Sequence, residues 1–236
     1  MSPPIVFVHG GLLDESMWDG VVAALDGFDC TCIRRRTRHD NPDWAAYSYE
    51  AEYEDVARVL DEVGPPRFLV GYSSGAIVAL GAAWHFGVDR LALFEPPLPV
   101  KGPVLGPHLA EAERLLAAGD VAGAVRVGLV EGVRVPPEVA DRMVADPRVV
   151  AAGEAWVHEF AEIDGLPADI GRYASVECPV LLLETSETQQ HHRDAVHALA
   201  GVLPDNEVVT LQGLDHGAAR TAPARLAAEL RRFFAG

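Results

Sequence analysis

Short apolar runs alternate along the chain with longer amphipathic or alanine-rich stretches. The first run, at positions 5–8, reads Ile-Val-Phe-Val and ends at His9, Gly10 and Gly11. A short β-branched run that stops at glycines is typical of a buried parallel strand entering a loop. The same pattern predicts further strands at 30–33, 68–70, 90–94, 180–183 and 208–211.

Helical patterns occupy the stretches between these runs. The clearest predicted helices span 18–25, 50–63, 74–86 and 222–234. Strands that are joined through helices run parallel, and the connecting helices pack on the sheet. The chain is therefore expected to have an α/β fold, with a mostly parallel sheet of about six strands and helices on both faces.

The alternation stops between positions 97 and 173. This stretch has apolar residues at helical spacing, and prolines and glycines separate its pieces. We predict that 97–173 is a helical lid inserted into a core formed by 1–96 and 174–236. No tandem repeat or low-complexity tail suggests a further domain.

Composition narrows the classes of partner. The chain has 236 residues, 49% of them hydrophobic, which suffices for one substantial core. The absence of a run of about 18 apolar residues, and of a basic start followed by an apolar stretch, predicts no membrane partner and a cytoplasmic location. A formal net charge of -16 argues against a nucleic-acid partner. A small-molecule substrate is expected, and the oligomeric state stays open.

Three cysteines, Cys30, Cys32 and Cys178, lie in or near apolar runs. Free thiols are the expected state, because the count is odd. The C-x-C spacing of Cys30 and Cys32 lacks a second pair of ligands at a familiar spacing. No metal site is therefore predicted.

The strongest motif is Gly-Tyr-Ser-Ser-Gly at 71–75, a G-x-S-x-G sequence placed where a predicted strand meets a predicted helix. A serine in this position sits on a sharp turn, and small residues two places before and after it let the backbone bend. The helix that begins at Ser74 adds partial positive charge, which favours an anionic intermediate. Ser73 is the predicted nucleophile.

A serine hydroxyl needs a base to remove its proton. His216 follows the last predicted strand and precedes the last helix, so it is expected at the same edge of the sheet as Ser73. His216 is therefore the predicted general base. His191, His192 and His197 lie in a helical stretch and are interpreted as surface residues.

The glycine loop after the first strand can supply hydrogen-bond donors. The backbone amides of Gly11 and Ser74 are expected to form an oxyanion hole, a pair of N–H groups that stabilises the tetrahedral intermediate of acyl transfer. We interpret His9 as a structural residue that holds this loop by hydrogen bonds.

Together these features resemble the α/β-hydrolase family across nearly the whole chain. The resemblance rests on His-Gly-Gly after the first strand, the elbow motif at 71–75, a lid after the next strand and a histidine near the end. It implies a serine hydrolase without a cofactor. It also implies a catalytic acid after one of two strands, between Ser73 and His216 in the sequence.

The two places for the acid differ in this chain. The later one usually carries Gly-x-x-Asp, but 185–188 reads Thr-Ser-Glu-Thr, with threonine in place of aspartate. The earlier place offers Glu95, which closes an apolar strand and would need a partner such as an imidazole. Glu95 is the favoured acid, and Glu187 and Glu184 remain alternatives.

A second departure lies after the second strand. Relatives often read Asp-Arg-Arg-Gly-x-Gly-x-Ser there, whereas 34–41 reads Arg-Arg-Arg-Thr-Arg-His-Asp-Asn. In this fold the loop lies near the site mouth, so Arg34, Arg35, Arg36 and Arg38 could contact an anionic substrate or a carrier phosphate. Surface ion pairs with the abundant acidic residues are the favoured interpretation.

The predicted activity is hydrolysis of an ester, thioester, lactone or related acyl bond in a small, largely apolar substrate. A serine nucleophile argues against the dehalogenase and epoxide hydrolase chemistry that relatives perform with aspartate. Two alternatives stay open: a cyclase or acyltransferase of the same fold that acts on a natural-product intermediate, and a non-enzymatic ligand receptor. The sequence does not separate them.

Overall fold

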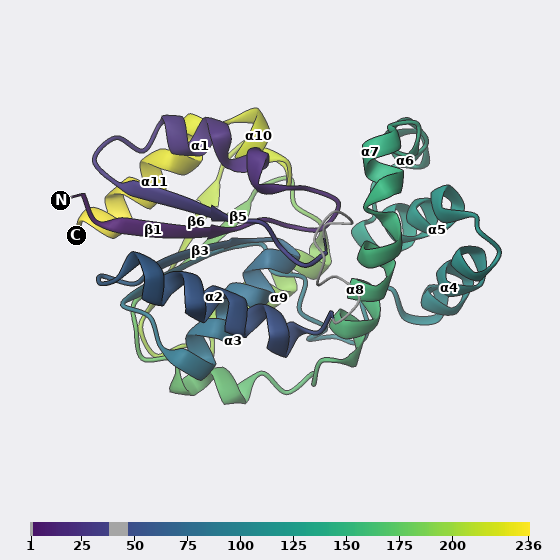
Figure 1. The fold of residues 1–236 in the computed structure, drawn as a ribbon. Coiled ribbons are helices and arrows are strands. Elements are labelled where there is room, and N and C mark those ends of the chain that lie inside the picture. The colour runs from purple at the N-terminus through teal and green to yellow at the C-terminus, as the bar shows by residue number, and fades with distance from the viewer. Residues whose placement is uncertain (1, 38–46) are drawn as a thin grey trace.

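Six strands form a single sheet in which all neighbouring pairs run parallel (Figure 1). The computed structural model describes residues 2–37 and 47–236. The strand order is β2-β1-β3-β4-β5-β6, with β1 at Pro4–Val8, β2 at Asp29–Ile33, β3 at Phe68–Tyr72, β4 at Arg90–Phe94, β5 at Val180–Thr185 and β6 at Asn206–Leu211. The predicted α/β fold is confirmed.

Helices cover both faces of this sheet. One layer contains α2 (Tyr49–Val63), α3 (Ser74–Phe86) and α9 (Gln190–Ala200). The opposite layer contains α1 (Asp19–Ala23), α10 (Ala218–Thr221) and α11 (Pro223–Ala235). The predicted helix at 18–25 is shorter than expected, because a 3₁₀ turn, η1 (Glu15–Trp18), begins this segment with its first turn capped by the Asp14 carboxylate.

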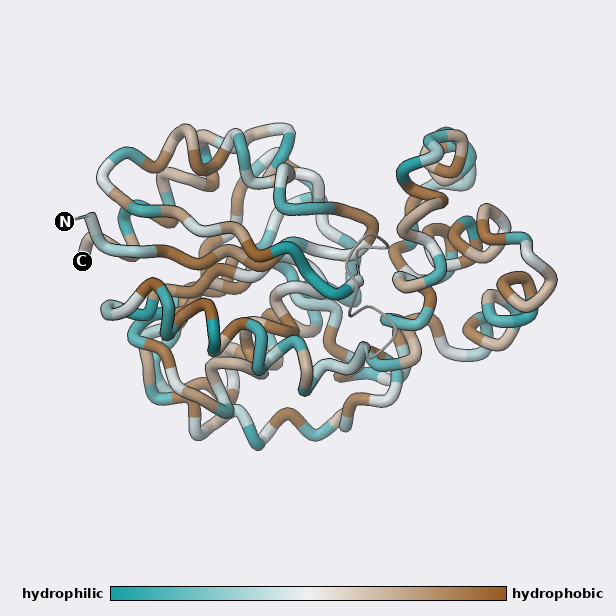
Figure 2. Tube along the Cα trace, viewed as in Figure 1, coloured by the Kyte–Doolittle hydropathy of each residue, from teal (hydrophilic) through white to brown (hydrophobic). Residues whose placement is uncertain are grey.

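The strands divide the core between the two helical layers. Because successive strand residues point to opposite faces, Val6 and Val8 of β1 join one apolar cluster while Ile5 and Phe7 join the other. All four side chains are fully buried. Figure 2 shows hydrophobic colour along β1 in the middle of the molecule, as expected for a strand covered on both sides.

The helical part of the segment between β4 and β5, from 106 to 165, lies together beyond one end of the sheet (Figure 1). It begins with η3 (Gly106–His108) and continues through α4 (Leu109–Ala117), α5 (Val121–Val127), the π-helix η4 (Gly128–Val133), α6 (Pro137–Val144), α7 (Pro147–Ala151) and α8 (Gly153–Gly165), before η5 (Gly171–Ser175). These helices occupy the segment for which the sequence predicts an inserted lid, and we call them the lid below. The lid bounds of 97–173 remain a prediction. Among the described residues, no helix is both long and apolar enough to cross a membrane.

Candidate active site

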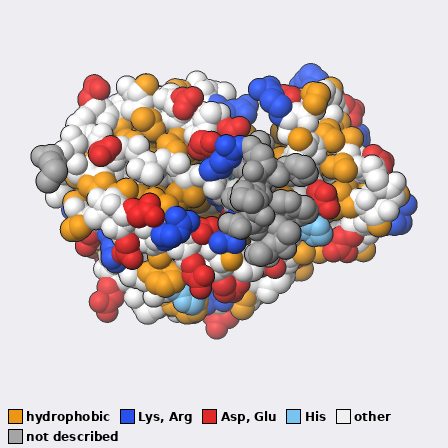
Figure 3. All heavy atoms as spheres, in the orientation of Figure 1, with side chains coloured by type: hydrophobic (Ala, Val, Ile, Leu, Met, Phe, Trp, Pro, Cys, Tyr) orange, Lys and Arg blue, Asp and Glu red, His pale blue; other side chains and the backbone are white. Residues whose placement is uncertain are grey.

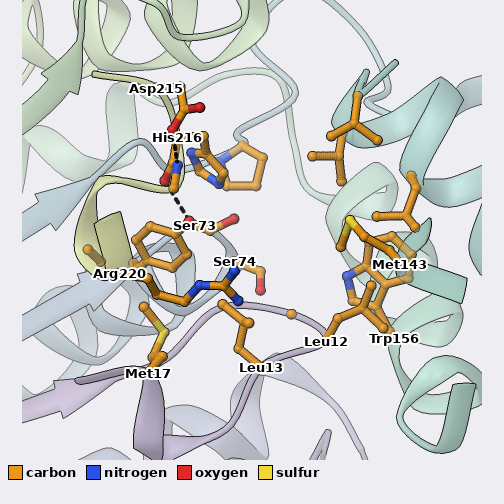
Figure 4. A pocket seen from close by; sticks show the side chains of 18 of the residues that line it. Leu12, Leu13, Met17, Ser73, Ser74, Met143, Trp156, Asp215, His216 and Arg220 are labelled. Atoms are coloured by element: carbon orange, nitrogen blue, oxygen red, sulfur yellow. Dashed lines mark hydrogen bonds between the residues drawn. The ribbon is translucent and has the colours of Figure 1, made fainter. Parts of the chain in front are cut away.

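A cavity of about 930 Å³ lies where the carboxyl ends of the strands face the lid. Figure 4 shows its two walls: Ser73, His216 and Arg220 stand on the core side, and Met143 and Trp156 of the lid stand opposite. The lid wall is largely apolar, and its further members are Leu129, Val133, Val139, Val149 and Phe160. A cavity with one apolar wall and a few polar groups opposite is the usual form of a small-molecule site.

Ser73 lies at a sharp turn between β3 and α3. Its backbone has φ 54° and ψ -127°, a region that side-chain-bearing residues rarely adopt. The Ser73 amide donates to the carbonyl oxygen of Phe94 at 2.9 Å, which ties the turn to the neighbouring strand. The strained residue thus presents its side chain to the cavity, and it is half-buried there.

The glycines of the motif are required by close backbone contacts. A Cβ atom at Gly75 would lie 2.2 Å from the His9 carbonyl oxygen, and one at Gly71 would lie 2.5 Å from the Cα of Ala76. Neither neighbour can give way, because both are backbone atoms. Gly75 therefore lets the start of α3 pack directly against the loop that follows β1, and Gly71 lets the end of β3 lie against α3.

The structure brings His216 and Glu95 together. Nδ1 of His216 lies 2.5 Å from Oε2 of Glu95. A carboxylate only accepts hydrogen bonds, so Nδ1 carries the hydrogen and Nε2 is left as the basic atom. The Tyr72 hydroxyl donates to the His216 carbonyl oxygen at 2.6 Å, and its ring stacks on the imidazole with centroids 4.9 Å apart. These contacts fix the ring at the cavity wall.

Glu95 is fully buried but well supplied with donors. Its Oε1 accepts from both the backbone amide and the hydroxyl of Thr185, each at 2.6 Å. Burial alone would raise the pKa of Glu95, but the hydrogen bond and charge of His216 and the two bonds from Thr185 outweigh it and lower the pKa. Glu95 is therefore held as a carboxylate, the form that can orient an imidazole.

The alternative acids occupy different surroundings. Glu187 lines the cavity with an exposed side chain. Glu184 accepts from the Thr210 hydroxyl at 2.8 Å and lies 3.3 Å from Nε2 of His197, on another part of β5. Of the three candidate carboxylates, Glu95 is the one for which the described contacts include the imidazole of His216.

His192 is a site residue that the sequence interpretation missed. The prediction of a surface position is wrong for it: His192 is 2% exposed, and its ring stacks on His216 with centroids 4.3 Å apart. Its neighbour His191 lines the cavity, whereas His197 is exposed as predicted. Burial lowers the pKa of His192 well below its usual value, so a neutral ring rests against His216. Only the packing of α9 onto the site reveals this contact.

The arginine-rich loop contains a second buried group. Arg35 is 2% exposed, so the prediction of surface ion pairs is wrong for it. Two buried carboxylates compensate the charge: Glu52 of α2 and Glu159 of α8 each lie 2.5 Å from its guanidinium. Arg36 pairs with Asp55 at 2.6 Å and Arg34 with Glu15 at 3.7 Å, nearer the surface.

The remaining member of that cluster, Arg38, lies outside the described residues.

The three cysteines are free, and burial raises the pKa of each thiol, to about 11 for Cys30 and Cys178 and about 12 for Cys32. Among residues 2–37 and 47–236, no group of three or more His, Cys, Asp or Glu side chains is arranged to hold a metal ion.

His9 joins the predicted oxyanion segments to Arg35. Its Nε2 accepts from the Arg35 amide at 3.2 Å, which requires a hydrogen on Nδ1, and Nδ1 lies 2.8 Å from the Gly10 carbonyl oxygen. Both ring nitrogens of the fully buried His9 side chain are thus engaged. This geometry matches a structural role for His9, with Gly11 and Ser74 nearby at the cavity wall.

Comparisons with known proteins agree with this architecture. The sequence profile of the Alpha/beta hydrolase family matches residues 5–229. A search of curated proteins found no match. Among solved structures, an alpha/beta hydrolase from Sphaerobacter thermophilus is 32% identical, with a TM-score of 0.82 over 98% of this chain and 92% of its own.

Two more distant structures share the fold. A carboxylesterase study of the thaumarchaeon Nitrososphaera gargenis provides one that is 19% identical, with a TM-score of 0.78 over 99% of this chain and 90% of its own. An esterase from a Rhodococcus species is also 19% identical, with a TM-score of 0.73 over 100% of this chain and 91% of its own. At such identities the likeness concerns the fold alone.

Proposed function

The chain belongs to the alpha/beta hydrolase family, and from that premise we propose that it is a serine hydrolase acting on an ester, thioester, lactone or related acyl bond. The observation that carries the proposal is the buried Glu95 carboxylate bound to Nδ1 of His216, beside the strained serine. An imidazole held in one tautomer next to a serine at an elbow suits proton abstraction from a hydroxyl. The esterases among the distant structures of the same fold support the acyl class.

The proposed reaction has two halves. Nε2 of His216 removes the Ser73 proton as Oγ attacks the acyl carbonyl, and the backbone amides of Gly11 and Ser74 stabilise the resulting oxyanion. The imidazolium, stabilised by Glu95, then returns the proton to the departing alcohol or thiol. Water activated by the same imidazole attacks the acyl-enzyme, releasing the acid and restoring Ser73.

The cavity favours a largely apolar acyl group. Most lid residues that line the cavity are aliphatic or aromatic, with Asp146 and Arg148 as charged exceptions. The core wall mixes apolar residues with polar ones, among them Ser16, Asp215 and Arg220. The acyl chain is placed against the lid and the leaving group against the core, since burying apolar surface is favourable and burying unpaired polar groups is not.

Labelling with a fluorophosphonate probe tests the proposal. The parent protein is expected to label covalently, Ser73→Ala not at all, and His216→Ala and Glu95→Gln at rates lower by about 1000-fold or more, since removing a triad member costs this much in known hydrolases. Glu187→Gln is the matched control, a cavity carboxylate without a described bond to His216, and it should label like the parent. A folded parent that does not label would refute the activated serine.

A further inference from the structure

Arg35 connects three parts of the molecule through one guanidinium. Its Nε and one terminal nitrogen donate to Glu52 of α2 at 3.0 and 2.5 Å, and the same terminal nitrogen donates to Glu159 of the lid helix α8 at 2.5 Å. The other terminal nitrogen donates to the His9 carbonyl oxygen at 3.1 Å and to the Ser74 hydroxyl at 3.0 Å. The rigid, planar fork makes all of these contacts in one orientation.

Two of those acceptors, the His9 carbonyl oxygen and the Ser74 hydroxyl, lie on the two segments that carry the amides of the proposed oxyanion hole. His9 begins the loop that carries the Gly11 amide, and Ser74 carries the second amide at the start of α3. The spacing of the two amides therefore depends on how far the loop stands from the helix. Arg35 bridges that gap from the buried side, with its side chain only 1% exposed.

The lid supplies the other end of this network. Glu159 is fully buried, and within the described residues its Oε2 has no hydrogen-bond partner. That oxygen lies against the loop that carries the Gly11 amide: a Cβ atom built at Gly11 would be 3.0 Å from it. Trp156, one turn earlier on α8, covers the same glycine, with its indole nitrogen 2.2 Å from that Cβ position. Because the Glu159 carboxylate is buried and touches this loop, it is placed to hold the loop rather than to solvate the surface.

We propose that Glu159 is a positioning residue for the oxyanion hole: acting through Arg35, it fixes the His9 carbonyl and the Ser74 side chain and so the spacing of the Gly11 and Ser74 amides. The inference rests on the proposed function, because the hole has meaning only for acyl transfer. It also gives the lid a second role besides lining the cavity, namely to fix the geometry of the oxyanion hole. The hole is complete only while α8 is docked on Arg35.

Kinetics of Glu159 variants test this assignment with para-nitrophenyl butyrate as substrate. Glu159→Ala is expected to lower kcat about tenfold to a hundredfold, less than outright loss of one oxyanion donor, while KM changes less than about threefold. Glu159→Gln keeps an acceptor for Arg35 but loses the charge, so kcat should fall less than in Glu159→Ala. The matched control is Asp141→Asn, which breaks the exposed lid pair with Arg126 and should match the parent.

An inhibitor separates positioning from general loosening. A butyl trifluoromethyl ketone forms a tetrahedral oxyanion on the nucleophile, so its affinity should fall in Glu159→Ala by the same factor as kcat. Ser74→Ala keeps the amide and removes the hydroxyl bound to Arg35, and its effect should not add fully to that of Glu159→Ala.

Several results would overturn the assignment. A kcat in both Glu159 variants within about twofold of Asp141→Asn would do so, as would a lower kcat with unchanged inhibitor affinity. If Glu159→Ala does not fold, Glu159→Gln carries the test alone. An inactive parent protein would instead refute the proposed function, so the two failures are distinguishable.

Discussion

At the scale of single residues, Thr185 accounts for one departure from the family pattern. The family sequence places a glycine where this chain has Thr185, and the threonine uses its amide and its hydroxyl to bind Glu95. Glu95, the proposed acid, closes β4, and Thr185 at the end of β5 binds its carboxylate. The threonine at this place and the glutamate on the neighbouring strand thus form one arrangement.

Replacing Thr185 by valine should weaken this support without removing the acid. Thr185→Val keeps the backbone donor and the shape of the side chain but loses a hydrogen bond to a buried carboxylate, so we expect kcat to fall about tenfold. Ester hydrolysis measures the change. Thr210→Val removes a comparable hydroxyl from Glu184 and is the control; equal rates for the two variants would contradict the role of Thr185.

Glu52 makes stability depend on pH in an unusual direction. Burial, aided by the charge of Glu159 and opposed by Arg35, raises the pKa of Glu52 from 4.5 to about 6. Between these values the folded protein binds more protons than the unfolded chain, so the free energy of unfolding falls as pH rises, by about 2 kcal/mol in total. Glu52→Gln should remove this slope.

Urea unfolding between pH 4 and 7, in roughly half-unit steps, checks the slope. As pH rises from 4.5 to about 6, the free energy of unfolding of Glu52→Gln should increase relative to that of the parent. Glu62→Gln, on the same helix but with a side chain 64% exposed, is the control and should run parallel to the parent. A parallel curve for Glu52→Gln would refute the prediction.

At the scale of elements, α8 determines how the lid is attached. Asp164 near its C-terminus accepts from three consecutive amides at the start of the lid segment, those of Val104 at 2.6 Å, Leu105 at 3.2 Å and Gly106 at 2.7 Å. One carboxylate thus holds the chain as it enters the lid. α8 contributes both this attachment and, from its middle, the Glu159 carboxylate that binds Arg35 of the core.

Removing that carboxylate should loosen the lid before the sheet. Asp164→Ala leaves three amides without their acceptor, and we expect the lid to lose about 2–4 kcal/mol of local stability. Limited proteolysis should then cut within 97–108 faster than in the parent, while the sheet remains folded. Asp169→Ala, which removes a single exposed turn contact to Gly171, is the control; equal cleavage of both variants would exclude the proposed attachment.

Hydrophobic periodicity along the sequence predicts the strands and long helices well, but it predicts the contacts between them poorly. The strands and the long helices follow from runs of buried or one-sided apolar residues, which are local in sequence. Arg35 and His192 were misassigned to the surface because their burial depends on carboxylates and rings that other elements bring, Glu159 and His216 among them. A polar residue in a polar stretch gives no local sign of such partners.

At the scale of the whole molecule, the parallel sheet explains why the site residues were accessible to prediction. Ser73, Glu95, Thr185 and His216 follow or close four neighbouring strands, β3 to β6, whose carboxyl ends meet at one edge. Strand ends can be read from sequence, so these positions can too. Figure 3 shows acidic side chains interspersed with basic ones on the face drawn.

The order of the site residues along the chain has a consequence for the timing of synthesis. Ser73 and Glu95 emerge from the ribosome early, but Thr185 arrives only with β5, after the lid segment, and His216 only after β6, the last strand. A nascent chain therefore carries the nucleophile and acid of the proposed triad long before it carries the base. If Ser73, Glu95 and His216 act as proposed, activity begins only once the last strand is in place, so that activity itself reports completed folding.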